Sequence, residues 1–373
     1  MGIHIVKRAN CPLWKKALFY LIAIGAALLI GSIILFDKGV NPIAYYTEIF
    51  TLTTINNPIP HTLMFNYLRD LVPLVLTAVG LSLAFKMRFW NIGGEGQFIM
   101  GAIGASIVAI KLGSTLPSAL VLILMCLVAM IMAGLYGLIV AFLKVKYDTN
   151  ETLLTLMLNY IALYFLTFLL QTKGSWNFFL DPGSNRPKPI VHSENTIFPT
   201  ISLGGGFELN TCVIFTFVIC VFVYIYLKRT KQGYEINVVG DSTGTAKYAG
   251  MKVNKIVLRT IFLSACLIGL AAAFKIGTKG VGALSTTITN DVGWTAIIVA
   301  WLAQLNTWAI VAVSALLNLL HYGSTLAPVR FPGATIDGTF ADILQGIILF
   351  LVLAADFMIR FRFVRTKKEE KNG

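Results

Sequence analysis

Long apolar stretches, separated by short polar ones, follow one another along almost the whole chain. About 20 apolar residues are enough for a helix to cross the hydrocarbon core of a membrane. One very long apolar stretch is interrupted by Gln304, Asn306 and Thr307, which predict a tight turn between two helices. The pattern predicts membrane helices at residues 17–36, 71–87, 92–111, 117–143, 152–171, 211–228, 256–274, 291–305, 308–327 and 339–359.

The composition agrees with this interpretation. Of the 373 residues, 57% are hydrophobic and 13% are charged, whereas soluble domains carry about 25% charged residues. No soluble domain of ordinary size fits between the apolar stretches. The sequence therefore predicts an all-α polytopic membrane protein with about ten transmembrane helices.

The basic residues indicate how these helices are oriented. A net charge of +13 would also suit a nucleic-acid-binding protein, but such a protein gathers its basic residues on one soluble face. Here they fall in alternate loops, as the positive-inside rule describes for cytoplasmic segments. We therefore expect both termini in the cytoplasm and no nucleic-acid partner. The basic loops lie before residue 17, at 86–88, at 144–146, at 228–259 and from 360 onward.

This orientation gives the expected domain organisation. A cytoplasmic tail at residues 1–16 precedes a single transmembrane domain at 17–360, and a basic cytoplasmic tail follows at 361–373. Two long loops, 37–70 and 172–210, are expected outside, and a loop at 229–255 is expected in the cytoplasm. The second external loop is rich in proline and contains Gly204-Gly-Gly206, so we expect it to be irregular or to carry only short elements.

The segment 275–291 fits neither a helix nor a free loop. It is too polar and glycine-rich for a membrane helix, yet it is apolar in places. Non-helical backbone inside a membrane is tolerated only where protein or a water-filled cavity surrounds it. The segment is either a plain external loop or a candidate gate that dips into the protein.

Several kinds of chemistry find no support in the sequence. The five cysteines lie in the N-terminal tail or in predicted helices, which indicates no disulfide framework. The four histidines are scattered without the spacing of a metal site, so we expect no metal. No Gly-Lys-Ser/Thr loop for ATP and no nucleophile with a nearby base is evident, so we expect a non-enzymatic chain without a cofactor of its own.

One carboxylate and two amides, Glu95, Asn91 and Gln97, stand at the start of the third predicted helix. A carboxylate in the middle of the bilayer would cost about 2.5–3.5 kcal/mol, but Glu95 lies only about one turn inside. Either Glu95 and Gln97 hydrogen-bond neighbouring helices and hold an irregular entry, or they line a pathway, as ionisable residues in membranes often do.

Asn159 is a lone amide in the fifth predicted helix, about two turns from the cytoplasmic edge. Such an amide usually joins two helices through hydrogen bonds. Contact with a transported substrate is the alternative.

The cytoplasmic stretch 228–259 contains the pattern of a short helix. Asp241 and Ser242 can cap its start, and Thr243–Ala249 forms its body. Gly250 suits its end. Such a helix, with Ala246, Tyr248 and Ala249 available for contact, is what a transporter would offer to a motor subunit. A solvated basic loop is the simpler alternative.

Three segments together resemble one family: Asn91–Gln97, Asn150–Glu151 with Thr155–Ala162, and Gly233–Glu235 followed by Lys247–Met251. They are similar to permease subunits of bacterial ABC importers in the branched-chain amino acid and simple-sugar superfamily. Within it they resemble the subgroup assigned to nucleosides and related solutes. The resemblance covers about residues 63–357.

The resemblance implies a multi-pass permease of the bacterial plasma membrane that takes up nucleosides or related solutes by alternating access. It implies three protein partners: a second related permease, a cytoplasmic ABC ATPase that holds the ATP and Mg²⁺, and an extracytoplasmic solute-binding lipoprotein. The stretch 241–251 would be the coupling helix. Its candidate contact residues are Asp241, Ser242, Ala246, Tyr248, Ala249 and Gly250.

Two features depart from the family pattern and leave the substrate open. Leu302-Ala-Gln-Leu-Asn306-Thr307 stands where the family has Leu-Leu-Gly followed shortly by Asn-Pro, and the preceding external segment carries Lys275 and Lys279. Simple sugars and riboflavin-like solutes are the alternatives to nucleosides. An ion-coupled secondary transporter would show paired broken helices in inverted repeats, and no clear internal repeat is seen. A membrane scaffold without a transport path is the third class.

Overall fold

The computed structural model describes residues 2–7, 12–52, 60–202, 204, 208–330 and 339–366. Within these residues, eight helices are long and apolar enough to cross a membrane. They are α1 (Leu13–Asp37), α3 (Pro60–Lys86), α4 (Gly94–Leu112), α5 (Ser118–Tyr147), α6 (Glu151–Gln171), α7 (Thr211–Arg229), α10 (Val253–Ile276) and α13 (Thr339–Arg360).

Each of the ten predicted membrane helices has a helix at its place, but two differ from the rest. The predicted helix at 291–305 is α11 (Val292–Leu302), whose 11 residues are too few to cross a membrane. The next is α12 (Thr307–Arg330), whose described apolar part runs from Thr307 to Gly323. The all-α polytopic fold class is confirmed, and among the described residues eight helices have the length and hydropathy of a membrane span.

The segment 37–70, for which the sequence predicts an external loop, is largely helical where the structure describes it. It contains α2 (Pro42–Leu52) and the first eleven residues of α3. Pro60 stands at the first position of α3, where its missing N–H has no helical partner to lose. The polar residues His61, Asn66 and Arg69 lower the hydropathy of this first part of the helix, so hydropathy alone did not predict it.

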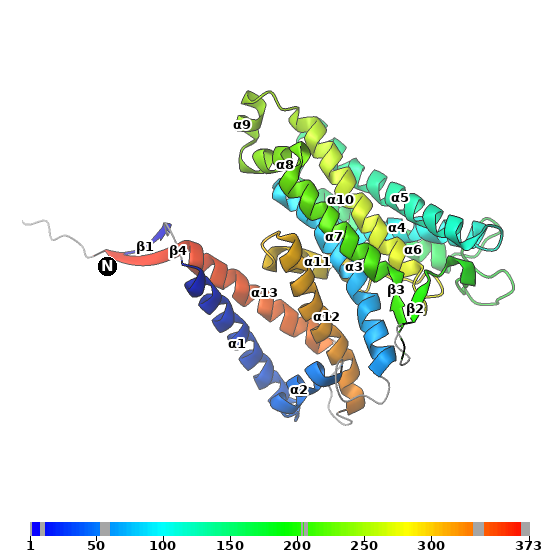
Figure 1. Ribbon diagram of the computed structural model, residues 1–373, viewed down its shortest axis with the longest axis horizontal. Coiled ribbons are helices and arrows are strands. Elements are labelled where there is room, and N and C mark those ends of the chain that lie inside the picture. The colour runs from blue at the N-terminus through cyan, green and yellow to red at the C-terminus, as the bar shows by residue number, and fades with distance from the viewer. Residues whose placement is uncertain are drawn as a thin grey trace, which may run out of the picture. The chain divides into compact units, whose positions relative to one another are not determined.

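The contacts within the chain define two compact units. The terminal unit comprises Met1–Pro58 and Leu319–Gly373. In it α1 packs along α13, and Tyr45 meets Phe340 edge to face at 5.3 Å. Neither tail was expected to form a strand, yet β1 (Gly2–Lys7) and β4 (Phe361–Thr366) form an antiparallel pair (Figure 1).

The central unit, Ile59–Asn318, is a helix bundle. Its inner helices α3, α4 and α10 are mostly buried, whereas α5, α6 and α7 present long apolar exposed faces, as helices next to lipid do. Small residues let α4 and α10 approach closely. A methyl group added at Gly101 would lie 2.7 Å from the Cα atom of Gly269.

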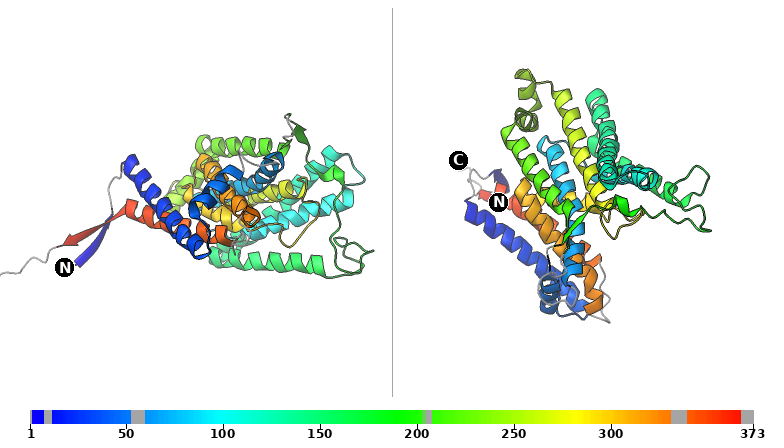
Figure 2. Two further views of the ribbon diagram at one scale, coloured as in Figure 1. Left: turned by 90° about the horizontal axis from the view of Figure 1, so that it is seen from below. Right: turned by 45° about the vertical axis from the view of Figure 1, so that its right-hand side comes forward.

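The two ends of the central unit carry different short elements (Figures 1 and 2). At one end α8 (Lys231–Asp241) and α9 (Thr243–Tyr248) connect α7 to α10. At the opposite end, the segment 172–210 carries the single turn η1 (Glu194–Thr196) and the hairpin strands β2 (Thr200–Ser202) and β3 (Glu208–Asn210). This segment covers the bundle without adding a long helix.

Candidate functional site

The chain turns sharply between α3 and α4, and two carboxamides close this corner. Asn91 and Gln97 exchange hydrogen bonds of 3.2 and 3.1 Å, and both side chains are buried. The Asn91 Oδ1 atom also accepts a hydrogen bond from the backbone N–H of Gly93, at 3.1 Å. The polar atoms of these two amides are thus engaged within the corner.

Helix α6 holds the same corner from the side. The Asn159 Oδ1 atom accepts the N–H of Gly96 at 2.8 Å, and its Nδ2 atom donates to the carbonyl of Ile92 at 2.9 Å. Thr155, one turn earlier, accepts the N–H of Ile92 at 3.2 Å. The first N–H groups of a helix lack partners within the helix. Here the side chain of Asn159, from α6, accepts the N–H of Gly96.

Glu95 joins the corner to α11. Its carboxylate accepts the backbone N–H of Gly293 at 2.8 Å and the hydroxyl of Thr289. The two backbones are so close that a methyl group at Gly293 would collide with the backbone of Glu95. Asp291, at the usual capping position of α11, makes no capping bond. Glu95 therefore caps α11 from α4, where the helix dipole also favours a negative charge.

The structure thus brings Asn91, Glu95, Gln97 and Asn159 together at one place. Their hydrogen bonds connect α4 with α6 and α11, which favours the structural interpretation of these residues over direct lining of a path. Sequence reasoning missed Thr155, although it stands four residues before Asn159 and so on the same helix face. Gly293 was also missed, because no local signal relates it to Glu95.

The short helix predicted in the cytoplasmic loop is α9, which is capped at its start by Ser242. The Ser242 hydroxyl accepts the N–H of Thr245 at 3.2 Å, and Gly250 ends the turn with a φ of +74°. Asp241 is the last residue of α8, so the expectation that it helps to cap α9 is corrected.

The exposure of α9 decides which of its residues can touch a partner. Tyr248 is 96% exposed, and Ala249 is exposed as well. Ala246 is fully buried, which corrects the expectation that it is available for contact. Its methyl group packs toward the bundle and holds α9 in place.

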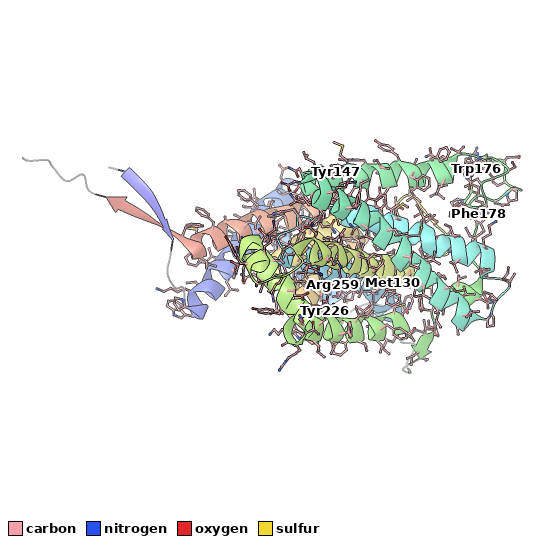
Figure 3. All side chains as sticks on the ribbon, turned by 90° about the horizontal axis from the view of Figure 1, so that it is seen from above. Met130, Tyr147, Trp176, Phe178, Tyr226 and Arg259 are labelled. Atoms are coloured by element: carbon pink, nitrogen blue, oxygen red, sulfur yellow. The ribbon has the colours of Figure 1, made fainter. Side chains whose placement is uncertain are left out.

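Helix α8 was not predicted, and it seats α9 on the bundle. Gly240 lies directly against the backbone carbonyl of Lys86, at the end of α3, and leaves no room for a side chain. Glu235 forms a salt bridge with Arg259 of α10, at 3.0 Å. Figure 3 shows Arg259 beside Tyr226 of α7, with which it also interacts. Movement of α8 is thereby tied to α3 and α10.

Charged side chains gather at the opposite end of the bundle. The Lys275 Nζ atom lies 2.6 Å from Asp70 Oδ1, and Arg69 reaches the same carboxylate at 3.3 Å. Lys279 pairs with Glu208 of β3 at 3.1 Å. The two lysines that depart from the family pattern are therefore both engaged in salt bridges.

A cavity of about 540 Å³ lies at this same end, between the end of α4 and the segment after α6. Its lining includes Lys111, Lys173, Asp181 and Phe178, the last of which is labelled with Trp176 in Figure 3. Since Lys111 and Glu95 stand at opposite ends of α4, the cavity is separate from the corner. Within the described ranges, no group of three or more His, Cys, Asp or Glu side chains could hold a metal ion.

Known proteins resemble this chain over most of its length. The chain is 28% identical to the nucleoside ABC transporter permease protein NupB of Lactococcus lactis, over 95% of this chain and 94% of the relative. It is 27% identical to the guanosine ABC transporter permease protein NupP of Bacillus subtilis, over 82% and 84%. The glucose ABC transporter permease protein TsgB13 of Haloferax volcanii is 24% identical, over 96% and 93%.

The permease relatives and the eight long apolar helices identify a multi-pass protein of the bacterial plasma membrane. The model of one family, described as branched-chain amino acid transport system, permease component, matches residues 63–353. The matched part includes the corner, α8, α9 and α11. Because it is well over half of the chain, this protein belongs to that family of permease components.

Proposed function

We propose that this protein is the permease subunit of an ATP-driven importer that takes up nucleosides by alternating access. The observation that carries the proposal is α9, a short helix capped by Ser242 and presenting Tyr248 almost fully to solvent. A transporter driven by an ion gradient does not need an exposed helix of this kind. A transporter driven by an ATPase needs a contact surface for that subunit. The names of NupB and NupP support nucleosides as the substrate class.

The contacts of the central unit indicate how a displacement of α9 would be transmitted to the other helices. Helix α8 carries it to the end of α3 through the contact between Gly240 and Lys86, and to α10 through Arg259. The corner after α3 is closed by Asn91 and leads directly into α4. Glu95 then connects α4 to α11. Packed cores pass such displacements on because they have little free volume.

The remaining parts of the importer would come from other chains. A cytoplasmic ABC ATPase would bind ATP and Mg²⁺ and press on α9, and a second related permease would complete the path. An extracytoplasmic lipoprotein would deliver the solute and supply most of the selectivity. Sugars are the second substrate class, because TsgB13 is named for glucose.

Reconstitution tests this proposal. The permease, its partner permease, its ATPase and its binding protein are placed in vesicles, and uptake of labelled guanosine is measured with and without ATP. We expect uptake only with ATP, and none when the Walker A lysine of the ATPase is replaced. Uptake driven by an ion gradient without ATP would contradict the proposal. Full competition by glucose, with none by other nucleosides, would move the substrate class to sugars.

A further inference from the structure

The segment 277–291 runs along the bundle from one end of α4 to the other. At one end, Gly277 and Gly113, which follows α4, both lie against Thr196, at 3.1 and 2.8 Å for an added methyl group. At the other end, Gly293 is bonded to Glu95, the second residue of α4. Because α4 has 19 residues, the segment covers a depth of about 27 Å at 1.5 Å per residue.

The backbone of this segment is not helical over that depth. It descends through separate turns, such as those closed by Ile288 N–H to Ser285 and by Asn290 N–H to Thr287. Its outer part is fixed by backbone hydrogen bonds from Phe198 to Gly277 and from His192 to Gly282, both 2.7 Å. The segment therefore enters the bundle from the end that the loop 172–210 covers.

The two faces of the lower part of the segment differ in chemistry. Leu284, Ile288 and Thr289 are buried against the bundle. Thr286, Thr287, Asn290 and Asp291 are exposed. This lower part lies level with Glu95, and the adjacent Gly96 meets Asn159 about two turns inside α6. Irregular backbone with exposed polar side chains does not face lipid at that level, because its polar groups would lack hydrogen bonds there. The exposed face therefore borders water or another protein surface.

Asp291 is the most unusual residue on this face. It has a φ of +56° and is exposed at the start of α11 without capping that helix, since Glu95 has taken this role. Within the described part of the chain, its carboxylate has neither a hydrogen bond nor a salt bridge. An ionised carboxylate accepts hydrogen bonds from neutral hydroxyl groups and repels phosphates.

We propose that the face formed by Thr286, Thr287, Asn290 and Asp291, the solute face, is a wall of the transport path, where the Asp291 carboxylate binds the sugar hydroxyls of a nucleoside. The ligand class rests on the proposed function, whereas the wall itself rests only on depth, polarity and exposure. The threonine hydroxyls add donors and acceptors beside the carboxylate. The face suits neutral ribosides and disfavours nucleotides.

Cysteine labelling tests the wall. Thr286→Cys and Thr287→Cys are made in the permease assembled with its partner permease and ATPase, and each is treated with a membrane-impermeant cationic thiol reagent. Phe222→Cys is the matched control, because Phe222 is 68% exposed on the apolar face of α7, and the unmodified protein gives the background. We expect both threonine positions to react at least tenfold faster than position 222. Rates equal to that of position 222 would overturn the proposal.

Protection from labelling tests the role of Asp291 without the binding protein. Guanosine should slow labelling of Thr287→Cys, and Asp291→Asn should raise the half-protecting concentration about tenfold, as expected for loss of a charged hydrogen bond. For 2′,3′-dideoxyguanosine, Asp291→Asn should change nothing. Asp148→Asn, at the exposed end of α5, is the control. An equal effect of Asp291→Asn on both compounds would overturn its assignment. If the cysteines are labelled but no nucleoside protects them, the face still borders the transport path, and nucleosides are refuted as its ligands.

Discussion

The carboxylate of Glu95 accepts a hydrogen bond from the backbone N–H of Gly293, 198 positions later in the chain. This bond joins the start of α4 to the start of α11. It explains why a charge is tolerated in an apolar segment, because the partner is a helix N-terminus, whose dipole favours a carboxylate. The same contact fixes the lower end of the segment 277–291, which carries the solute face.

Replacing Glu95 tests the cap. Glu95→Ala removes the acceptor and should lower the free energy of unfolding by about 0.5–2 kcal/mol, the usual effect of losing a helix cap. Glu95→Gln keeps an acceptor oxygen and should recover part of this loss. Thermal unfolding of the detergent-solubilised protein measures both. Equal stability of Glu95→Ala and the unmodified protein would mean that the cap contributes nothing.

Asn159 offers a second test, in which its two hydrogen bonds are separated. Asn159→Leu leaves the N–H of Gly96 and the carbonyl of Ile92 without their partner, at about 1–3 kcal/mol for each buried group. Asn159→Asp keeps the acceptor for Gly96 and loses the donor to Ile92. We expect the order of stability to be Asn, then Asp, then Leu. A leucine variant as stable as the unmodified protein would show that the two hydrogen bonds of Asn159 do not stabilise the fold.

The sequence was sufficient for the parts of the fold that depend on local pattern. Hydropathy located the ten helices, and the serine and glycine at either side of Thr243–Tyr248 were enough to predict α9. Helix α8 could have been found, since Thr230 caps its start by accepting the N–H of Gly233. Its mean hydropathy is low, so a search for membrane helices passed over it.

Contacts between distant residues could not be predicted in the same way. The burial of Ala246 depends on how α9 is seated on the bundle, which no local pattern states. The bond from Glu95 to Gly293 depends on the path of segment 277–291 through the bundle. For Asn91, Gln97 and Asn159, the sequence limited the choice to helix contact or path lining. Their hydrogen-bond partners were needed to favour the first.

The close contact between Gly240 of α8 and the carbonyl of Lys86 predicts a steric effect on the coupling of ATP hydrolysis to transport. Gly240→Ala would place a methyl group on the carbonyl of Lys86, so α8 should shift and transport per ATP should fall several-fold. Gly346→Ala, in α13, is the matched control, because its new methyl group would meet nothing within 4 Å. Proteoliposome uptake and ATPase activity are measured together. Equal transport per ATP in both variants would show that α8 does not rest on α3 as described.

The loop 172–210 covers segment 277–291, and the stability with which this cover packs on the bundle should depend on pH through His192. Burial lowers the pKa of His192 from 6.5 to about 4, and neither ring nitrogen has a hydrogen-bond partner among the residues that the structure describes. The buried ring is neutral, whereas the released ring takes up a proton below pH 6.5. Docking of the cover is therefore fully stable above pH 6.5 and loses up to about 3 kcal/mol as the pH falls toward 4.

Hydrogen exchange of residues 190–198 at pH 7.5 and pH 5 measures this effect, after correction for intrinsic rates. We expect faster exchange at pH 5 in the unmodified protein and a much smaller change in His192→Phe, which cannot be protonated. An equally large change in both proteins would assign the pH dependence to another group.

Helix α9 is the proposed contact of the ATPase, and the variant Tyr248→Asp tests this contact. The ratio of guanosine molecules imported to ATP molecules hydrolysed is measured in proteoliposomes. Tyr147→Asp is the control, an exposed tyrosine at the end of α5. We expect at least a tenfold lower ratio for Tyr248→Asp, because a charge enters the contact surface, and little change for Tyr147→Asp. An unchanged ratio for Tyr248→Asp in a correctly assembled complex would show that the ATPase does not act through α9.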